Sequence, residues 1–257
     1  MEKLSAKNKV KIMKLSIITV NFGHSKKIEK LLESVKNNPP SADFEFIVVD
    51  NDSPNNDWAN VEELCKTLDN CHVIKIAENR GFGAGNNEAA KFAKGEFLAF
   101  VNPDILVEKK CFDELLKVFE DGNIGISSPS LVNPDGSKQI SARKFPTLAE
   151  LFYRRFLNNK ESESQEFPDW VHGSFMVMKK SLFEKIGGFD DRFFLFFEDT
   201  DLCHRVWEQK LRVALVKNAR AVHNDKRLSG KDAYSVFNKY FWIHALSAVK
   251  YFLKWRR

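Results

Sequence analysis

The acidic side chains best suited to chemistry stand in two short segments that lie far apart in the chain. Asn102-Pro103-Asp104 directly follows an apolar segment, whereas Glu198, Asp199 and Asp201 follow a run of aromatic residues. A lone carboxylate at the end of a strand can hold a divalent metal that bridges two phosphates. A carboxylate beside a pocket can act as a general base. Each segment also has an ordinary structural interpretation, which is a turn for the first and helix capping for the second.

Three further positions carry polar side chains where chemistry is conceivable. The segment Asp50-Asn51-Asp52 could accept a hydrogen bond from a nucleobase N–H, or it could simply form an Asx-turn. His223 follows the last apolar segment and could complete a metal site, while His172 stands near another strand-like segment. A single histidine is more often a surface or packed residue, so both interpretations stay open at this level.

The glycine-rich segment at 79–87 allows a ligand to approach the backbone closely. It does not match a dinucleotide fingerprint, because the glycine expected after Gly81 and Gly83 would fall at position 86, which is Asn86. The segment also follows the third predicted strand instead of the first. These two departures disfavour a dinucleotide-dependent dehydrogenase.

Strands and helices alternate along the first half of the chain, which predicts an α/β fold with a mostly parallel sheet flanked by helices. The predicted strands are 14–20, 44–49, 72–76 and 96–101, and the predicted helices are 26–36, 58–68 and 83–93. Ligands bind such sheets beyond the carboxyl ends of the strands. This rule selects the loops 21–24, 50–55 and 102–104. The second half is less regular, with shorter strands at 124–127, 171–178 and 212–216 and a helix at 200–209.

The last part of the chain predicts a helix from Ala233 to Phe252. Its buried stripe would contain Phe237, Phe241, Ala245, Ala248 and Phe252. The tail at 250–257 mixes aromatic and basic residues. It could rest peripherally on an anionic membrane surface, or the helix could pack on the domain and leave a basic end in solution.

Composition restricts the class of protein. The chain has 257 residues with 43% hydrophobic content, which is enough for one large domain with its own core. A formal charge of +5 without a basic stripe suits small anionic ligands and argues against nucleic acid. The four cysteines form no C-x-x-C pair, which predicts reduced core residues in a cytoplasmic protein and no zinc site. No signal peptide and no transmembrane helix are expected.

Seven segments together resemble the inverting glycosyltransferases of family two, which have the GT-A fold. In chain order they are SIITVNF, FIVVDNDS, ENRGFGAGNN, FVNPD, HGSFMVMKK, GGFDDRFFLFFEDTDLCHR and VHN. They span about residues 14–225. The combination of GFGAGNN, NPD and FFEDTDL is most similar to the rhamnosyltransferase-type branch, which builds bacterial cell-surface polysaccharides.

The resemblance implies a UDP- or dTDP-sugar donor and a Mg²⁺ or Mn²⁺ cofactor. Asp104 matches the last acid of the family's D-x-D motif and would ligate the metal, with help from His223. Asn102 replaces the first acid of that motif and weakens the charge of the metal site. The residues implied in nucleotide-sugar binding are Thr19, Asn21, Asp50, Asp52, Arg80, Gly81, Asn102 and Asp104.

The resemblance also assigns the reaction. Asp199 matches the second acid of the family's E-D pair, the catalytic base, and Glu198 would position the acceptor or the base. His172, Gly173 and Asp201 would line the acceptor and sugar pocket. The acceptor would be a saccharide or a lipid-linked saccharide at the inner face of the plasma membrane.

The implied domains are an extension at 1–13, a GT-A domain at 14–232 with nucleotide-sugar and acceptor halves that meet near residue 105, and a C-terminal helix and tail at 233–257. Two rival functions are a sugar nucleotidyltransferase and a non-catalytic nucleotide-sugar-binding module. The first would need a basic glycine-rich loop after the first strand, which residues 20–24 lack.

Overall fold

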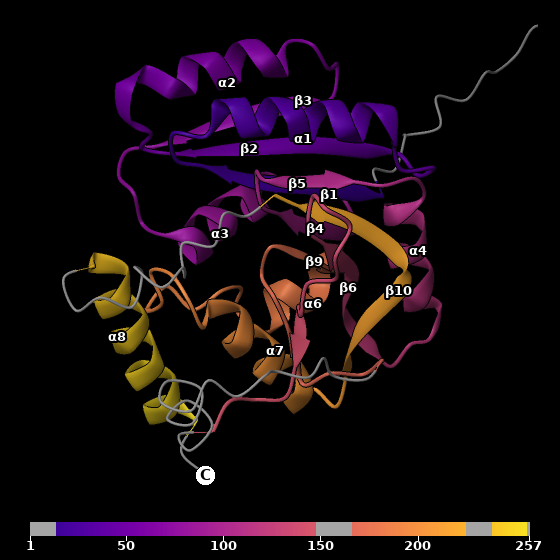
Figure 1. Cartoon of the computed structure of the whole chain (residues 1–257), viewed down its shortest axis with the longest axis vertical. Helices are drawn as coiled ribbons and strands as arrows, with labels where there is room; N and C mark the ends of the chain where they lie inside the picture. Colours follow the sequence, from indigo (N-terminus) through magenta and orange to yellow (C-terminus); the bar gives the residue numbers. More distant parts are fainter. Residues whose placement is uncertain (1–13, 148–165, 225–237, 256–257) are drawn as a thin grey trace, which may run out of the picture.

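The computed structural model describes residues 14–147, 166–224 and 238–255. An eight-stranded sheet with the order β3-β2-β1-β4-β9-β6-β10-β5 forms the centre, and helices cover both of its faces (Figure 1). The α/β fold with a mostly parallel sheet, predicted from the alternation of elements, is confirmed. The predicted extension at 1–13 lies outside the described residues.

The first half of the chain forms four parallel strands joined by helices. The elements are β1 (Leu15–Asn21), α1 (Ser25–Asn37), β2 (Phe44–Asn51), α2 (Asp57–Cys65), β3 (Cys71–Ile76), α3 (Phe82–Phe92) and β4 (Phe97–Val101). Strands β1, β2 and β4 are mostly apolar and buried because helices cover both faces of a parallel sheet, whereas β3, at the edge of the sheet, has exposed His72 and Lys75. Their carboxyl ends all lie at one edge, as the alternation of strands and helices requires.

The second half adds strands of both directions to the sheet. Its elements are β5 (Ile105–Val107), α4 (Cys111–Lys117), β6 (Ile124–Val132), β9 (Phe175–Lys179), α6 (Lys180–Lys185), α7 (Glu198–Glu208) and β10 (Arg212–His223). Strand β9 runs antiparallel to β4 and to β6, and β5 pairs antiparallel with the end of β10. A two-stranded sheet of β7 (Ala142–Arg143) and β8 (Trp170–Val171) lies beside the main one.

Neighbouring residues of β1 point into two different cores, one on each face of the sheet. Ile17 packs with Ile28 of α1 and Phe112 of α4, whereas Ile18 packs with Ala89 of α3 and Phe183 of α6. Successive strand side chains alternate between faces, so this one strand serves both cores. The rigid sheet between them is the platform for the loops at its carboxyl edge.

Helix α8 (Lys239–Lys254) is held against the rest of the molecule by a third, small cluster. Ser247 and Tyr251 are its buried residues, and Ala248 and Phe252 of the predicted stripe pack against the same cluster, so the observed contact face includes two of the predicted residues. Phe237 of the predicted stripe lies outside the described residues. Within the described part of the chain, no helix combines the length and apolar character needed to cross a bilayer.

The cysteine prediction is wrong for one pair. Cys65 and Cys71 form a disulfide, while Cys111 and Cys203 are free and buried. Cys65 is the last residue of α2 and Cys71 the first residue of β3. The short connection folds back on itself and brings the two Cα atoms to 5.0 Å, which residue spacing alone does not reveal.

Candidate active site

Asn21 and Asp50 meet at the carboxyl ends of β1 and β2. The Asn21 side-chain amide donates to Oδ1 of Asp50 at 2.9 Å, and it also reaches Ser53 and Asp57. The backbone N–H of Ser53 donates to the other Asp50 oxygen at 3.1 Å. Both Asn21 and Asp50 are buried. The Asp50 carboxylate is therefore fixed in orientation at the edge where a ligand is expected.

The loop at Arg80 and Gly81 is tied to the same edge by Asn51. The Asn51 side chain accepts from the Arg80 backbone N–H at 3.2 Å and donates to the Gly81 carbonyl at 3.1 Å. Gly81 has a φ of 90°, and a Cβ atom there would stand 2.1 Å from the carbonyl oxygen of Phe194. Only glycine allows this approach, which brings the loop of Arg80 and Gly81 against the segment that precedes α7.

Asp104 lies between two basic side chains. Its Oδ2 is 3.0 Å from the Lys27 ammonium, and its Oδ1 is 3.4 Å from Nε2 of His223. Burial opposes ionisation of Asp104, but the contact with His223 and the charge of Lys27 outweigh it and hold the pKa well below its usual range. The group is therefore a carboxylate at neutral pH, which is the form that a metal binds.

His223 is oriented by a residue that the sequence analysis did not select. Its Nδ1 lies 2.9 Å from Oε1 of Gln139, and the Gln139 amide donates to the His223 carbonyl at 3.0 Å. With Oε1 of Gln139 as its acceptor, Nδ1 carries a proton. In the neutral ring Nε2 then has the lone pair that a metal needs, whereas the favourable contact with Asp104 described above is made by the protonated ring. In the described residues Oδ1 of Asp104 and Oδ1 of Asn102 are buried without a hydrogen-bond donor. No group of three or more histidine, cysteine or acidic side chains able to hold a metal occurs among the described residues, so a divalent cation at Asp104 and His223 would need a phosphate ligand to complete its coordination.

The turn at Gly173–Ser174 connects this region with Asp199. The backbone N–H of Asn102 donates to the Ser174 carbonyl at 2.8 Å, and the backbone N–H of Gly173 donates to Oδ2 of Asp199 at 2.8 Å. Asp104 follows Asn102 by two residues. The two acids that the sequence separates by almost a hundred positions therefore flank one turn.

Glu198 and Asp199 open α7 in different states. The backbone N–H of Thr200 donates to Oδ1 of Asp199 at 2.7 Å, so each oxygen of Asp199 has a backbone donor. Glu198 is buried, and within the described chain its Oε2 has no hydrogen-bond partner. Burial, and then the negative charge of Asp199, raise the pKa of Glu198 well above its usual range. Of the two, Asp199 is the one whose carboxylate oxygens both accept backbone hydrogen bonds.

The backbone just before this pair adopts an uncommon conformation. Phe196 and Phe197 have φ values of 68° and 67°, a left-handed region that costs a non-glycine residue roughly 1–3 kcal/mol. The ring of Phe197 packs 5.3 Å from that of Tyr251 in α8. Packing against α8 thus helps to hold the strained turn that delivers Glu198 and Asp199.

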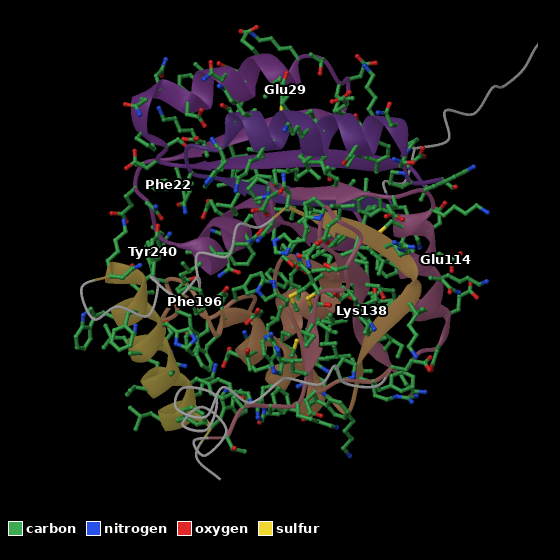
Figure 2. All side chains as sticks on the ribbon, in the orientation of Figure 1. Phe22, Glu29, Glu114, Lys138, Phe196 and Tyr240 are labelled. Carbon is green, nitrogen blue, oxygen red and sulfur yellow. A yellow bond between two sulfur atoms is a disulfide. The ribbon has the colours of Figure 1, made fainter. Side chains whose placement is uncertain are left out.

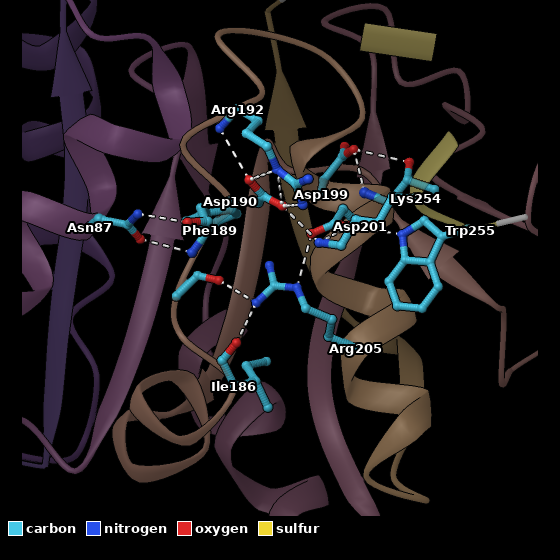
Figure 3. Close-up of polar contacts among 12 residues, drawn as sticks. Asn87, Ile186, Phe189, Asp190, Arg192, Asp199, Asp201, Arg205, Lys254 and Trp255 are labelled. Carbon is cyan, nitrogen blue, oxygen red and sulfur yellow. Dashed lines mark hydrogen bonds and ion pairs between the residues drawn. The ribbon is translucent and has the colours of Figure 1, made fainter. Parts of the chain in front are cut away.

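Asp201 does not lie in a pocket, contrary to the prediction from the sequence. It is fully buried, with Oδ2 2.9 Å from Arg205 Nε and Oδ1 bonded to both Lys254 and Trp255 at 2.6 and 2.8 Å (Figure 3). Its three partners leave it no free face for a sugar. Asp201 instead joins α7 to the end of α8, because an acid in the first turn of a helix can point away from the substrate edge.

The remaining predicted residues occupy different surroundings. Thr19 is fully buried in β1, and its hydroxyl has no partner among the described residues. Asp52 is exposed with a φ of 60°, as expected of a turn. The His172 ring centroid lies 5.9 Å from that of His223. An open pocket of about 320 Å³ is lined by Arg80 but by none of the predicted acids, so it is separate from Asp104 and Asp199.

Sequence reasoning missed the residues that support the site. Lys27, Asn51, Asp57 and Gln139 all hold predicted residues in place. Lys27 and Asp57 lie in helical segments, where a charged side chain is usually exposed to solvent. Gln139 follows a turn and carries no motif, so only the folded position of His223 identifies it.

Comparison with known proteins assigns a family to this arrangement. The family model described as glycosyl transferase family 2 matches residues 16–187, and one described as the N-terminal domain of galactosyltransferase matches residues 159–227. Rhamnosyltransferase WbbL of Escherichia coli is 28% identical over 256 residues, covering 93% of each chain. A low-salt glycan biosynthesis hexosyltransferase, Agl10 of Haloferax volcanii, is 29% identical and covers 82% of this chain and 67% of its own.

Solved structures show the same fold at lower identity. The mannosyltransferase PcManGT of Pyrobaculum calidifontis superposes with a TM-score of 0.64 at 18% identity, covering 95% of this chain and 76% of that chain. GalNAc-T7 superposes with a TM-score of 0.65 at 15% identity, and the match spans 83% of this chain but only 43% of that chain. Both belong to the fold that the motifs predicted. Since the family model covers more than half of the sequence, the chain belongs to glycosyl transferase family 2.

Proposed function

We propose that the chain transfers a hexose or deoxyhexose from a nucleotide-activated sugar to an acceptor hydroxyl, with inversion at the anomeric carbon. The observation that carries this proposal is the Gly173–Ser174 turn, which brings the Asp104 segment and Asp199 to adjacent residues. One acid is suited to the donor diphosphate and the other to the acceptor. A binding module would have no need for the second acid.

The donor side is assigned to Asp50, Asp104 and His223. Asp50 would accept a hydrogen bond from the base, and Asp104 and Nε2 of His223 would hold Mg²⁺ or Mn²⁺. When bound, the cation supplies positive charge that stabilises the departing diphosphate. The similar structures of GalNAc-T7 and PcManGT are complexes that include Mn²⁺ and a nucleotide or nucleotide sugar, which supports a divalent cation here without choosing between the two metals.

The acceptor side is assigned to Asp199. An acceptor hydroxyl is a weak nucleophile until a base removes its proton. As its oxygen bonds to the anomeric carbon, the proton moves to Asp199 and the bond between that carbon and the diphosphate oxygen breaks. The backbone donors at Gly173 and Thr200 hold the Asp199 carboxylate in place for this transfer. Attack opposite to departure inverts the configuration in one step, without a covalent intermediate.

The relatives support our choice of substrates. Rhamnosyltransferases from Escherichia coli and Mycobacterium tuberculosis are similar over most of this chain, and the second is described as acting on N-acetylglucosaminyl-diphospho-decaprenol. We assign a UDP- or dTDP-linked donor, with rhamnose as the first candidate, and a saccharide or lipid-linked saccharide acceptor. Such an acceptor places the enzyme at the cytoplasmic face of the membrane, in peripheral contact through its C-terminal part.

A thermal-shift screen of nucleotide sugars with and without Mn²⁺ tests the proposal. A true donor at 100 times its dissociation constant stabilises the folded state by about 2.7 kcal/mol. Nucleotide release with the stabilising donor, dependent on an added acceptor, is the expected result. Stabilisation without any acceptor-dependent release would identify a binding module and reject the transfer.

A further inference from the structure

Helix α8 presents an apolar face to solvent although its opposite face is firmly held. Trp242, Leu246, Val249 and Leu253 are 56%, 58%, 56% and 54% exposed. Their spacing of three and four residues places them on one side of the helix. We call these four residues the outer stripe. Large apolar side chains that line up in this way mark an interaction surface more often than isolated ones do.

The inner face of α8 fixes the direction in which the outer stripe points. Ser247 donates to the Leu195 carbonyl at 2.9 Å, and Lys250 donates to the Arg192 carbonyl at 2.6 Å. Tyr251 packs against Phe193 and Phe197. Lys254 and Trp255 are bonded to Asp201, as described above. A helix clamped by these contacts cannot roll to bury its outer stripe in its own domain.

The charges around the outer stripe select its occupant. Helix α8 contains no aspartate or glutamate, and Lys239 and Lys250 are both exposed beside the stripe. Two further cations, Arg256 and Arg257, follow in the sequence. Lys254 is not available, because Asp190 and Asp201 hold it. Within α8 the charged side chains are all positive, and an apolar face with such a border is complementary to a surface that is apolar inside and anionic outside.

We propose that the outer stripe of α8 docks on an anionic phospholipid bilayer and lies in the plane of its headgroups. The stripe would enter the bilayer, while the exposed Lys239 would meet lipid phosphates. Tyr240 of α8 lies on the side of the molecule where Phe22 follows β1 (Figure 2). Docking would therefore hold the carboxyl edge of the sheet close to the membrane. This inference deepens the proposed function. Its link to a lipid-linked acceptor rests on that function, whereas the binding of α8 to a membrane does not.

Vesicle flotation tests the docking without any donor or acceptor. The full chain should float with vesicles of phosphatidylglycerol and phosphatidylcholine, remain in solution with phosphatidylcholine alone, and dissociate at high salt. Leu246→Glu should weaken the partition by about tenfold or more, because it places a charge within the apolar contact. Phe92→Glu is the matched control. Phe92 is also 56% exposed but ends α3, so its substitution should leave flotation unchanged.

The outcomes separate this inference from the proposed function. Leu246→Glu should retain transfer to a water-soluble acceptor, so loss of flotation alone supports the docking. Flotation without any transfer activity would reject the proposed function and keep the docking. Absence of wild-type flotation at low salt, or an equal loss in Phe92→Glu, overturns the docking. A wild-type dimer that Leu246→Glu disperses, without flotation, would also overturn it and identify a second copy as the occupant.

Discussion

Nδ1 of His223 lies 2.9 Å from Oε1 of Gln139, on the ring nitrogen that does not face Asp104. When Oε1 of Gln139 accepts from Nδ1, the neutral ring keeps its lone pair on Nε2, the nitrogen that faces Asp104. This contact therefore makes Gln139 a positioning residue for the proposed metal site, although Gln139 lies in a turn-rich segment with no motif of its own.

Replacement of Gln139 should weaken the metal site. In Gln139→Leu the Nδ1 proton loses its acceptor, so His223 no longer presents Nε2 reliably. Partners of metal-ligating histidines typically contribute 10–100-fold to affinity, and we expect a loss in about that range. Calorimetric titration of Mn²⁺ with UDP present measures it. Gln139→Glu keeps an oxygen at the same place and should retain the affinity, so equal losses in both variants would contradict the role.

Replacement of Asp199 should abolish most of the turnover while donor binding persists. Asp199→Asn keeps the shape of the side chain but removes its capacity to take the acceptor proton. We expect kcat to fall by roughly 10²–10⁴-fold. Initial rates of nucleotide release, together with donor affinity, separate the two effects. Asp121→Asn changes an exposed acid and should be silent; near-full turnover in Asp199→Asn would assign the base to another group.

Glu198 should make the stability of the folded state fall as the pH rises. Its folded pKa is raised by burial and by Asp199, whereas in the unfolded chain it ionises near the ordinary value for glutamate. Below that value both states are protonated and no difference exists. As the pH rises through and above it, only the unfolded state releases the proton, so the wild type loses stability.

Glu198→Gln removes this titration. The melting temperature of the variant should therefore exceed that of the wild type increasingly between pH 5 and pH 8, by roughly 2–4 °C for each kcal/mol. Glu208→Gln, at the exposed end of the same helix, should show no such trend. A melting-temperature difference that stays constant over this pH range would show that Glu198 has no raised pKa.

Gly81 should tolerate no side chain. Gly81→Ala combines a φ of 90° with a Cβ that would stand 2.1 Å from the Phe194 carbonyl oxygen. We expect the free energy of unfolding to drop by about 1–3 kcal/mol, and donor affinity to drop as well, since Arg80 would shift. Urea unfolding measures the first effect. Gly122→Ala is the control, because a Cβ added there would meet no atom within 4 Å and the φ of Gly122 is ordinary.

Residue patterns predicted the first half of the fold closely because local signals there agree with tertiary structure. The run at 44–49, for example, extends by two residues to Asn51 in the observed β2. The second half depends on long-range pairing. The segment 171–178 contains two short strands, β8 and β9, separated by the Gly173–Ser174 turn, and no local pattern marks that break.

In the candidate site, too, local sequence predicted some residues correctly, whereas others depend on tertiary packing. Side-chain type and position after a strand were sufficient to select Asp50 and Asp104. They were not sufficient to exclude Asp201, because direction around a helix depends on what packs beside it. Lys254 and Trp255, at the end of α8 about fifty residues later, both bond to Asp201. No sequence pattern around Asp201 predicts these contacts.

The antiparallel direction of β9 makes the alignment of the two acids a matter of strand register. Because β9 starts where β4 ends, Phe175 pairs with Val101 and Ser174 reaches Asn102. A slip of two residues along β9 would keep every apolar side chain on its own face yet move the turn by about 7 Å. Such a slip would also shift the buried side chains of β9 within a close-packed core, and Gly173 would lose Asp199. The pairing of two buried strands therefore sets the relative position of the two acids proposed for sugar transfer.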